Sequence, residues 1–168
     1  LVHCVGDIHQ PLHTGRPEDK GGLDTPVAWF GTPMSLHKVW DSGLLDTVHP
    51  EFADLAAEKT GATYAADLLG RFSQPTVNDA MDVEGWLSES LALRAAAYDP
   101  IYETNQEKYR ALHLGEIDRQ IYSAGIRLAH MLNAIAAGAP VPAREADLWR
   151  QIEAILGDPR KIIHLHHV

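Results

Sequence analysis

The clearest pattern in the chain is the recurrence of apolar side chains at helical spacing. It predicts helices over residues 36–48, 50–58, 62–72, 79–98, 105–137 and 143–156, and a first helix that ends near Gln10-Pro11. In the segment 105–137, the stripe that we expect to be buried consists of Ile117, Ile121, Ala124, Leu128, Met131, Leu132 and Ile135. Because helices dominate, the expected fold class is all-α, a helical bundle.

Residues 14–33 interrupt the helical pattern. This stretch contains four glycines and three prolines, so we expect one long irregular loop with at most a short hairpin around residues 27–30. Loops of this length are usually functional or disordered, and its place between two groups of candidate ligands favours function. A second break at residues 138–142 precedes the last predicted helix and a His-rich end at residues 164–167, which we interpret as a frayed terminus.

Two pairs of side chains carry the candidate chemistry. His3 with Asp7, and His37 with Asp41, are each four residues apart, which places both members of a pair on one face of a helix. Imidazole nitrogens and carboxylate oxygens are normal zinc ligands, whereas magnesium and calcium sites are built from oxygen atoms. A catalytic zinc takes about three protein ligands, and His13 is the candidate third, because the Gln-Pro-Leu run before it breaks the helix. The alternative interpretation is a set of structural histidines.

Composition narrows the classes of function. The chain has 168 residues, of which 45% are hydrophobic and 22% charged, and this balance suits one globular domain. Its formal charge of −9 argues against binding nucleic acid through a broad basic surface, although bound zinc would add positive charge where a phosphate sits. No apolar run is long enough to span a bilayer. The single cysteine, Cys4, allows no intrachain disulfide and is expected to pack in the core.

Beyond these patterns, the sequence resembles a known family. The runs HCVGDIHQPLHTG (residues 3–15), DKGG (19–22), VAWFG (27–31) and LHKVWD (36–41) are similar to those of the zinc-dependent single-strand nucleases typified by nuclease P-one and nuclease S-one. The likeness extends to about residue 136. It implies the helical fold that this family shares with bacterial zinc-dependent phospholipase C. On this basis, we expect residues 1–137 to form a partial nuclease domain and residues 138–168 to form a C-terminal helix and tail packed on it.

The resemblance also assigns metal ligands to individual residues. Intact family members bind three zinc ions. The positions of His3 and Asp7 belong to a close pair of ions that the aspartate bridges, so Asp7 is the expected catalytic residue. The positions of His13, His37 and Asp41 surround the third zinc, and one complete site is therefore expected here. The remaining ligands of the paired site precede the start of this sequence in family members, so the chain looks like a piece of a longer enzyme.

Four further residues gain roles from the resemblance. His9 and Asp19 are expected to orient metal ligands, and Ser35 to help position the phosphate. Trp29 is a candidate for stacking on a base, with a core position as the alternative.

The implied reaction is hydrolysis of phosphodiester bonds in single-stranded DNA and RNA to 5′-phosphorylated products, with 3′-nucleotidase activity in addition. The resemblance further implies a secreted or periplasmic protein whose signal peptide is not in this chain. We expect a monomer whose partner is nucleic acid and not a membrane. Two alternatives stay open, namely phospholipase C activity on the same fold and a non-catalytic metal-binding helical domain.

Overall fold

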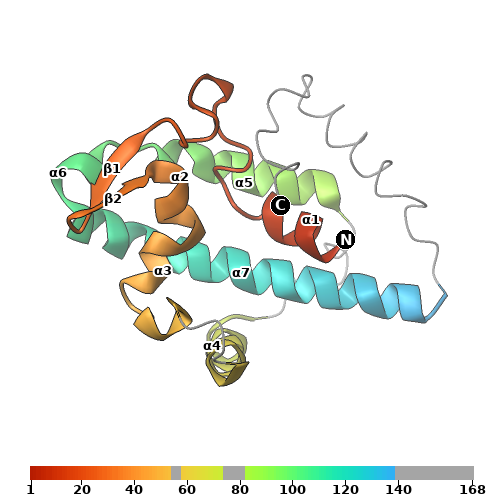
Figure 1. Cartoon of the computed structure of the whole chain (residues 1–168). Coiled ribbons are helices and arrows are strands. Elements are labelled where there is room, and N and C mark those ends of the chain that lie inside the picture. Colours follow the sequence, from red (N-terminus) through yellow and green to blue (C-terminus); the bar gives the residue numbers. More distant parts are fainter. Residues whose placement is uncertain (54–57, 74–81, 139–168) are drawn as a thin grey trace.

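The computed structural model describes residues 1–53, 58–73 and 82–138. Its longest element is α7, Gln106–Ala136, which crosses the molecule in Figure 1. Helix α5, Val83–Ala97, is joined to α7 by side-chain hydrogen bonds, and α4, Glu58–Arg71, packs on another side of α7. The short α1, Val2–Ile8, contacts both α5 and α7. The predicted all-α fold class is confirmed.

The irregular loop contains a β-hairpin that is larger than predicted. Strands β1, Pro26–Trp29, and β2, Thr32–Ser35, pair antiparallel. The two turn residues, Phe30 and Gly31, have φ values of 45° and 83°, as the commonest two-residue hairpin turn requires. Glycine adopts this conformation without strain, whereas Phe30 is held by a 2.6 Å hydrogen bond from its N–H to Oε1 of Gln106. The hairpin is thereby fixed to the start of α7.

The helix predicted over residues 36–48 is present over residues 36–46, but its middle turn is not α-helical. The structure has α2, Leu36–Lys38, then a π-helical turn, η2, Val39–Gly43, and then α3, Leu44–Asp46. The hairpin packs against this turn, where Nε1 of Trp29 donates to the carbonyl of Gly43 over 2.9 Å. A Cβ atom at Gly43 would lie 3.2 Å from the Trp29 ring, so glycine permits the close approach. Single π turns often occur at functional sites.

Other boundaries differ by smaller amounts. A 3₁₀ turn, η1, Pro17–Asp19, lies in the loop, and η3, Pro50–Ala53, replaces the first turns of the helix predicted over residues 50–58. Helix α4 continues through residues 60–61, where we predicted a break, and the short α6, Ile101–Thr104, was not predicted. The helix predicted at 143–156 lies outside the described residues, and so does the domain predicted at 138–168 except for its first residue. Within the described part, no helix has the length and apolar character needed to cross a membrane.

The buried apolar residues form two clusters. One lies under the hairpin and the end of α7 beside it and includes Leu12, Trp29, Leu36, Val39, Trp40, Leu44 and Tyr109. The other joins α1, α5 and α7 and includes Cys4, Val5, Ile8, Trp86, Leu87 and Met131. Cys4 is therefore in the core, as predicted.

The predicted buried stripe of α7 is only partly correct. Ile117 and Met131 are buried, but Ile121, Leu132 and Ile135 are 39%, 45% and 37% exposed. Different elements contact α7 along its length, so its buried face is not one straight stripe. Three buried residues of α7 are instead polar and have partners outside the helix. Asp118 pairs with Arg71, Gln120 donates to the His9 carbonyl, and Arg127 pairs with Glu89.

Candidate metal centre

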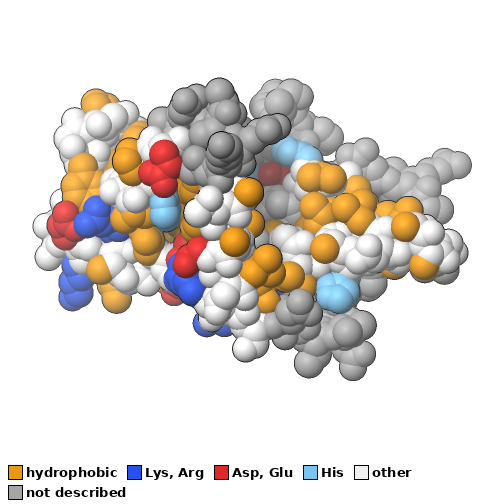
Figure 2. Space-filling view, turned by 90° about the horizontal axis from the view of Figure 1, so that it is seen from below, with side chains coloured by type: hydrophobic (Ala, Val, Ile, Leu, Met, Phe, Trp, Pro, Cys, Tyr) orange, Lys and Arg blue, Asp and Glu red, His pale blue; other side chains and the backbone are white. Residues whose placement is uncertain are grey.

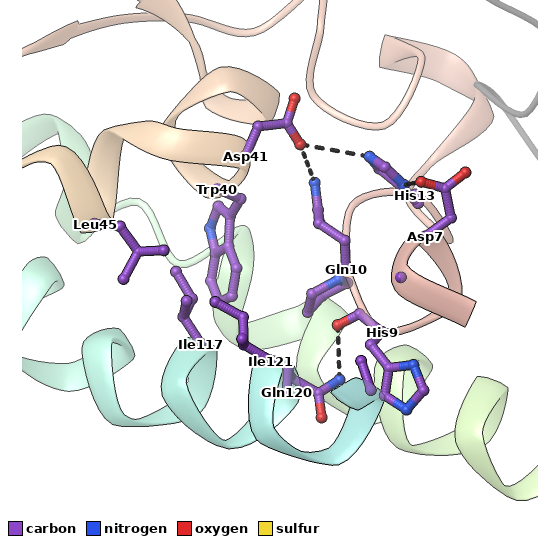
Figure 3. A pocket seen from close by; sticks show the side chains of 13 residues that line it. Asp7, His9, Gln10, His13, Trp40, Asp41, Leu45, Ile117, Gln120 and Ile121 are labelled. Carbon is purple, nitrogen blue, oxygen red and sulfur yellow. Dashed lines mark hydrogen bonds and ion pairs between the residues drawn. The ribbon is translucent and has the colours of Figure 1, made fainter. Parts of the chain in front are cut away.

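Three side chains from two segments converge beside the end of α1. One donor atom each of His13, His37 and Asp41 can be chosen so that all three atoms lie within 4.8 Å of one another. Nε2 of His13 is 3.4 Å from Oδ1 of Asp41, and Nε2 of His37 is 3.5 Å from Oδ2. Figure 3 shows His13 and Asp41 pointing toward each other across the mouth of a cavity. The convergence predicted for these three residues is therefore present.

The loop before the hairpin fixes the orientation of His37. Nδ1 of this buried ring is 2.9 Å from the carbonyl of Gly21, and a carbonyl only accepts, so Nδ1 carries the proton. In the neutral ring, Nε2 then has the lone pair that a metal ligand needs. Gly21 has a φ of +65°, and a Cβ atom there would lie 2.3 Å from the Leu12 carbonyl. Only glycine fits this position, which the sequence interpretation did not single out as functional.

His13 lies between two carboxylates. Its Nδ1 is 3.1 Å from Oδ1 of Asp7, while its ring stacks on His37 with 5.0 Å between centroids. Burial opposes protonation of His13, but the contacts with Asp41 and Asp7 outweigh it and raise the pKa of this imidazole to about 9. The 3.1 Å contact with Asp7 is an ion pair of the buried Nδ1.

Asp41 is oriented by a residue that sequence reasoning missed. Nε2 of Gln10 donates to Oδ1 of Asp41 over 2.9 Å, as Figure 3 shows. Burial favours the neutral acid, yet contacts with His13, His37 and Gln10 hold the pKa of Asp41 below its usual value. Gln10 stands in the quoted His-Gln-Pro-Leu-His run, so its nearness to the ligands was the available signal.

The other predicted pair, His3 with Asp7, lies next to the group of three candidate ligands. Nε2 of His3 is 3.1 Å from Oδ2 of Asp7, and Asp7 contacts His13 through its other oxygen. Oδ2 of Asp7 is buried and has no hydrogen-bond partner. Asp7 is thus placed between His3 and His13.

His9 does not orient a metal ligand through its ring. Its Nδ1 lies 2.6 Å from the Val5 carbonyl, and its Nε2 lies 2.8 Å from Nη1 of Arg127. Burial is the main reason that its pKa is lowered to about 4, so the ring is neutral at pH 7. Its carbonyl accepts from Nε2 of Gln120. His9 therefore anchors α1 to α7, and the expectation for its side chain needs this correction.

Asp19 acts on the ligands through the loop. Its Oδ1 accepts from the Gly22 N–H and from the Tyr98 hydroxyl, and its Oδ2 accepts from the Thr25 hydroxyl. These bonds shape the turn whose Gly21 carbonyl faces His37. The orienting role predicted for Asp19 would therefore act on His37 through the backbone of this turn.

Ser35 and Trp29 have structural contacts. The Ser35 hydroxyl accepts from the Lys38 N–H and caps α2, which carries His37. Trp29 is 2% exposed, so neither ring face is available to stack on a base. The core alternative for Trp29 is the correct one.

The residues present fit zinc. Ligand atoms about 2.0–2.1 Å from a tetrahedral zinc are roughly 3.4 Å apart. His13 lies 3.4 Å from one oxygen of Asp41 and His37 lies 3.5 Å from the other, and one donor atom from each of the three residues lies within 4.8 Å of the other two. Two nitrogens and one oxygen form a donor set that zinc accepts and that calcium and magnesium disfavour. The buried Oδ2 of Asp7, which has no hydrogen-bond partner among the described residues, is a further group that a cation would satisfy.

Comparison with known proteins agrees with this geometry. The S1/P1 Nuclease family matches residues 1–137. The chain belongs to this family. Endonuclease 2 of Arabidopsis thaliana is 32% identical over 145 residues, which cover 80% of this chain and 50% of the relative. Nuclease S1 of Aspergillus oryzae is 29% identical over 160 residues, which cover 82% of this chain and 53% of the relative.

The chain spans about half the length of these curated relatives of the S1/P1 nuclease family. The matched region, residues 1–137, includes every proposed ligand and all of α7. No solved structure matches the chain.

Proposed function

We propose that this chain supplies ligands of a zinc-dependent nuclease that hydrolyses phosphodiester bonds in single-stranded DNA and RNA. The products are 5′-phosphorylated, and 3′-nucleotidase activity accompanies the reaction. The observation that carries the proposal is the meeting of His13, His37 and Asp41 inside the region that matches the nuclease family. The protein is proposed to be exported to the periplasm or the medium, like the proteins that the sequence resembles.

In this proposal, His13, His37 and Asp41 hold one zinc ion, while His3 and Asp7 contribute to a neighbouring pair. Zinc supplies Lewis-acid activation of the phosphate and of the attacking water when it is bound. Asp7 is the proposed catalytic residue because its carboxylate lies between His3 and His13. Gln10 and the Gly21 carbonyl keep the Asp41 oxygen and the His37 ring in place.

The cavity beside these ligands supports a substrate with an apolar part. It has a volume of about 320 Å³ and is bordered by Asp7, His13 and Asp41 on one side and by Trp40, Leu45, Ile117 and Ile121 on the other. Figure 3 shows Ile117 and Ile121 on α7 facing Trp40 and Leu45, which belong to η2 and α3. We propose that a base or sugar of the strand packs against the apolar side of this cavity, while the phosphate of the strand faces the proposed zinc ligands.

The distribution of charge favours binding of a nucleic acid strand at a few points over binding along an extended basic surface. In Figure 2, the Lys and Arg side chains of the described residues form separate small groups on the face shown, without a continuous stripe. With a formal charge of −9, affinity for phosphate then has to come from the metal centre and a few selected cations.

The test is zinc binding and cleavage by the chain and two variants. Asp41→Asn should weaken zinc binding by at least about tenfold, since it removes an anionic ligand. Asp46→Asn is the matched control, because Asp46 lies in α3, five positions further along, and outside the ligand group. Equal zinc affinity of the two variants would refute the site.

Substrate preference is tested with the zinc-loaded chain. Cleavage of denatured DNA without cleavage of short-chain phosphatidylcholine supports the nuclease. Cleavage of the lipid alone would favour phospholipase C, and zinc binding without either activity would favour the non-catalytic alternative.

A further inference from the structure

A second cavity lies away from the proposed ligands. It has a volume of about 680 Å³ and lies between the end of α4, the middle of α5 and the middle of α7. We call it the arginine groove, after Arg71, Arg119 and Arg127, which border it together with Phe72, Glu89 and Tyr122. None of the residues proposed to bind zinc lines it.

Two of its three arginines are paired with carboxylates. Arg71 lies 2.7 Å from Asp118 and 3.2 Å from Asp67, and Arg127 makes two bonds of 2.7 and 2.8 Å to Glu89. Because each of these two guanidiniums faces a carboxylate, Arg71 and Arg127 add little net positive charge to the groove.

Arg119 differs from the other two. Among the residues that the structure describes, no carboxylate lies within ion-pair distance of it, and its guanidinium sits 5.1 Å from the centre of the Phe72 ring. Within the described residues, the groove thus has one guanidinium, that of Arg119, that no carboxylate neutralises. In a chain with a formal charge of −9, such a cation is an attractive point for an anion.

Two buried donors of the groove also have no acceptor among the described residues. Tyr122 is 6% exposed and Arg127 is 3% exposed, yet within this part of the chain the Tyr122 hydroxyl and Nε of Arg127 have no hydrogen-bond partner. Buried polar groups are usually satisfied, by protein, water or an ion. Arg119 is exposed, so its guanidinium is accessible to an anion from solvent.

We propose that the arginine groove binds a phosphate group, with Arg119 and the Tyr122 hydroxyl as donors. Phosphate has several acceptor oxygens and a negative charge, so it meets both needs. The aromatic wall suits a nucleotide in particular, because the Phe72 ring lies beside the guanidiniums of Arg71 and Arg119 and 5.3 Å from the Tyr122 ring. The phosphate comes from a nucleic acid strand or from a free phosphate or mononucleotide. The first source rests on the proposed nuclease function.

The experiment uses the full chain in EDTA, so that the metal centre neither binds phosphate nor cleaves. One arm measures binding of inorganic phosphate by calorimetry, and the other measures anisotropy of a labelled oligothymidylate at low salt. Arg119→Gln should weaken binding about tenfold, the size expected for loss of a charge-assisted hydrogen bond. Tyr122→Phe should weaken it several-fold and leave stability unchanged or higher, because the deleted hydroxyl has no partner.

Arg110→Gln is the matched control. Arg110 also lies on α7 and over a phenylalanine ring, 5.2 Å from the centre of Phe30, but outside the groove. If the groove variants bind the oligonucleotide more weakly, whether or not they also bind inorganic phosphate more weakly, the ligand is a phosphate of a strand. If they bind only inorganic phosphate more weakly, the ligand is free phosphate. Both groove variants matching Arg110→Gln in both arms would overturn the proposal. Failure of the nuclease proposal would appear as absent zinc binding or cleavage and would leave the phosphate arm intact.

Discussion

Replacing Tyr109 by phenylalanine tests whether the core positions the metal centre. The Tyr109 hydroxyl accepts from Nε1 of Trp40 over 2.7 Å and donates to the Ala97 carbonyl over 2.6 Å. Tyr109 is fully buried, so Tyr109→Phe leaves a donor and an acceptor without water. Each buried group that loses its partner costs about 1–3 kcal/mol. We expect the free energy of unfolding to fall by about 2–4 kcal/mol, measured by urea denaturation.

The same variant should also weaken zinc binding. Trp40 precedes Asp41 in the π turn, so a displaced indole moves the carboxylate, and we expect about tenfold lower affinity in a chelator competition. Tyr102→Phe is the control, since Tyr102 is buried and packs edge-on at 5.8 Å from Tyr109 but has no bond to Trp40. If both variants lose the same stability and keep the same zinc affinity, the argument that Trp40 positions Asp41 is wrong.

Three further outcomes follow from named contacts. Zinc binding at pH 7 should release about one proton, because the pKa of His13 is raised to about 9 and the metal displaces the proton of this imidazole. Calorimetry in buffers of different ionisation enthalpy measures the number of protons released. A number near zero would contradict the assignment of His13 as a ligand. Because burial lowers the pKa of His9 to about 4, only the unfolded chain gains this proton as the pH falls below 6.5, so stability is lost toward pH 4. Between pH 7 and pH 5, the wild type should therefore lose about 2 kcal/mol more than His9→Gln in urea denaturation. Ser35→Ala should cost about 1 kcal/mol through loss of the α2 cap, whereas Ser88→Ala on exposed α5 surface should be near neutral by the same measurement.

The long elements were predictable because their patterns are local. Helix α7 shows apolar spacing over most of its length, and Asn105 caps its start by accepting from the Lys108 N–H. The π turn within residues 36–46 was not predictable from spacing, because Trp29, which contacts it at Gly43, belongs to a different segment. The partner of the buried Arg127, Glu89, is also far away in sequence, and no periodicity reveals this pair.

Residue types and spacing predicted the two His–Asp pairs and His13, and the resemblance to the nuclease family grouped His13 with His37 and Asp41, whereas the supports of these ligands were not predictable. His13, His37 and Asp41 meet as expected, since each belongs to a short run with a metal-binding pattern. Gln10 and the Gly21 carbonyl were missed because an amide side chain and a backbone oxygen carry no metal signal of their own. Trp29 was placed at the surface as one option, and its burial follows from the hairpin folding back on α7.

The ligands of the metal centre are positioned by the core and not by regular helices. Each of the three directly follows a buried apolar residue, namely Leu12, Leu36 and Trp40, which are 0%, 0% and 4% exposed and belong to one cluster. A ligand next to such an anchor has little freedom, even though His13 lies beyond the end of α1 and Asp41 lies in a π turn. This arrangement explains how an irregular segment can hold three donor atoms within 4.8 Å of one another, close enough to meet on one ion. It also means that a cavity under any of the three anchors should reduce metal affinity together with stability.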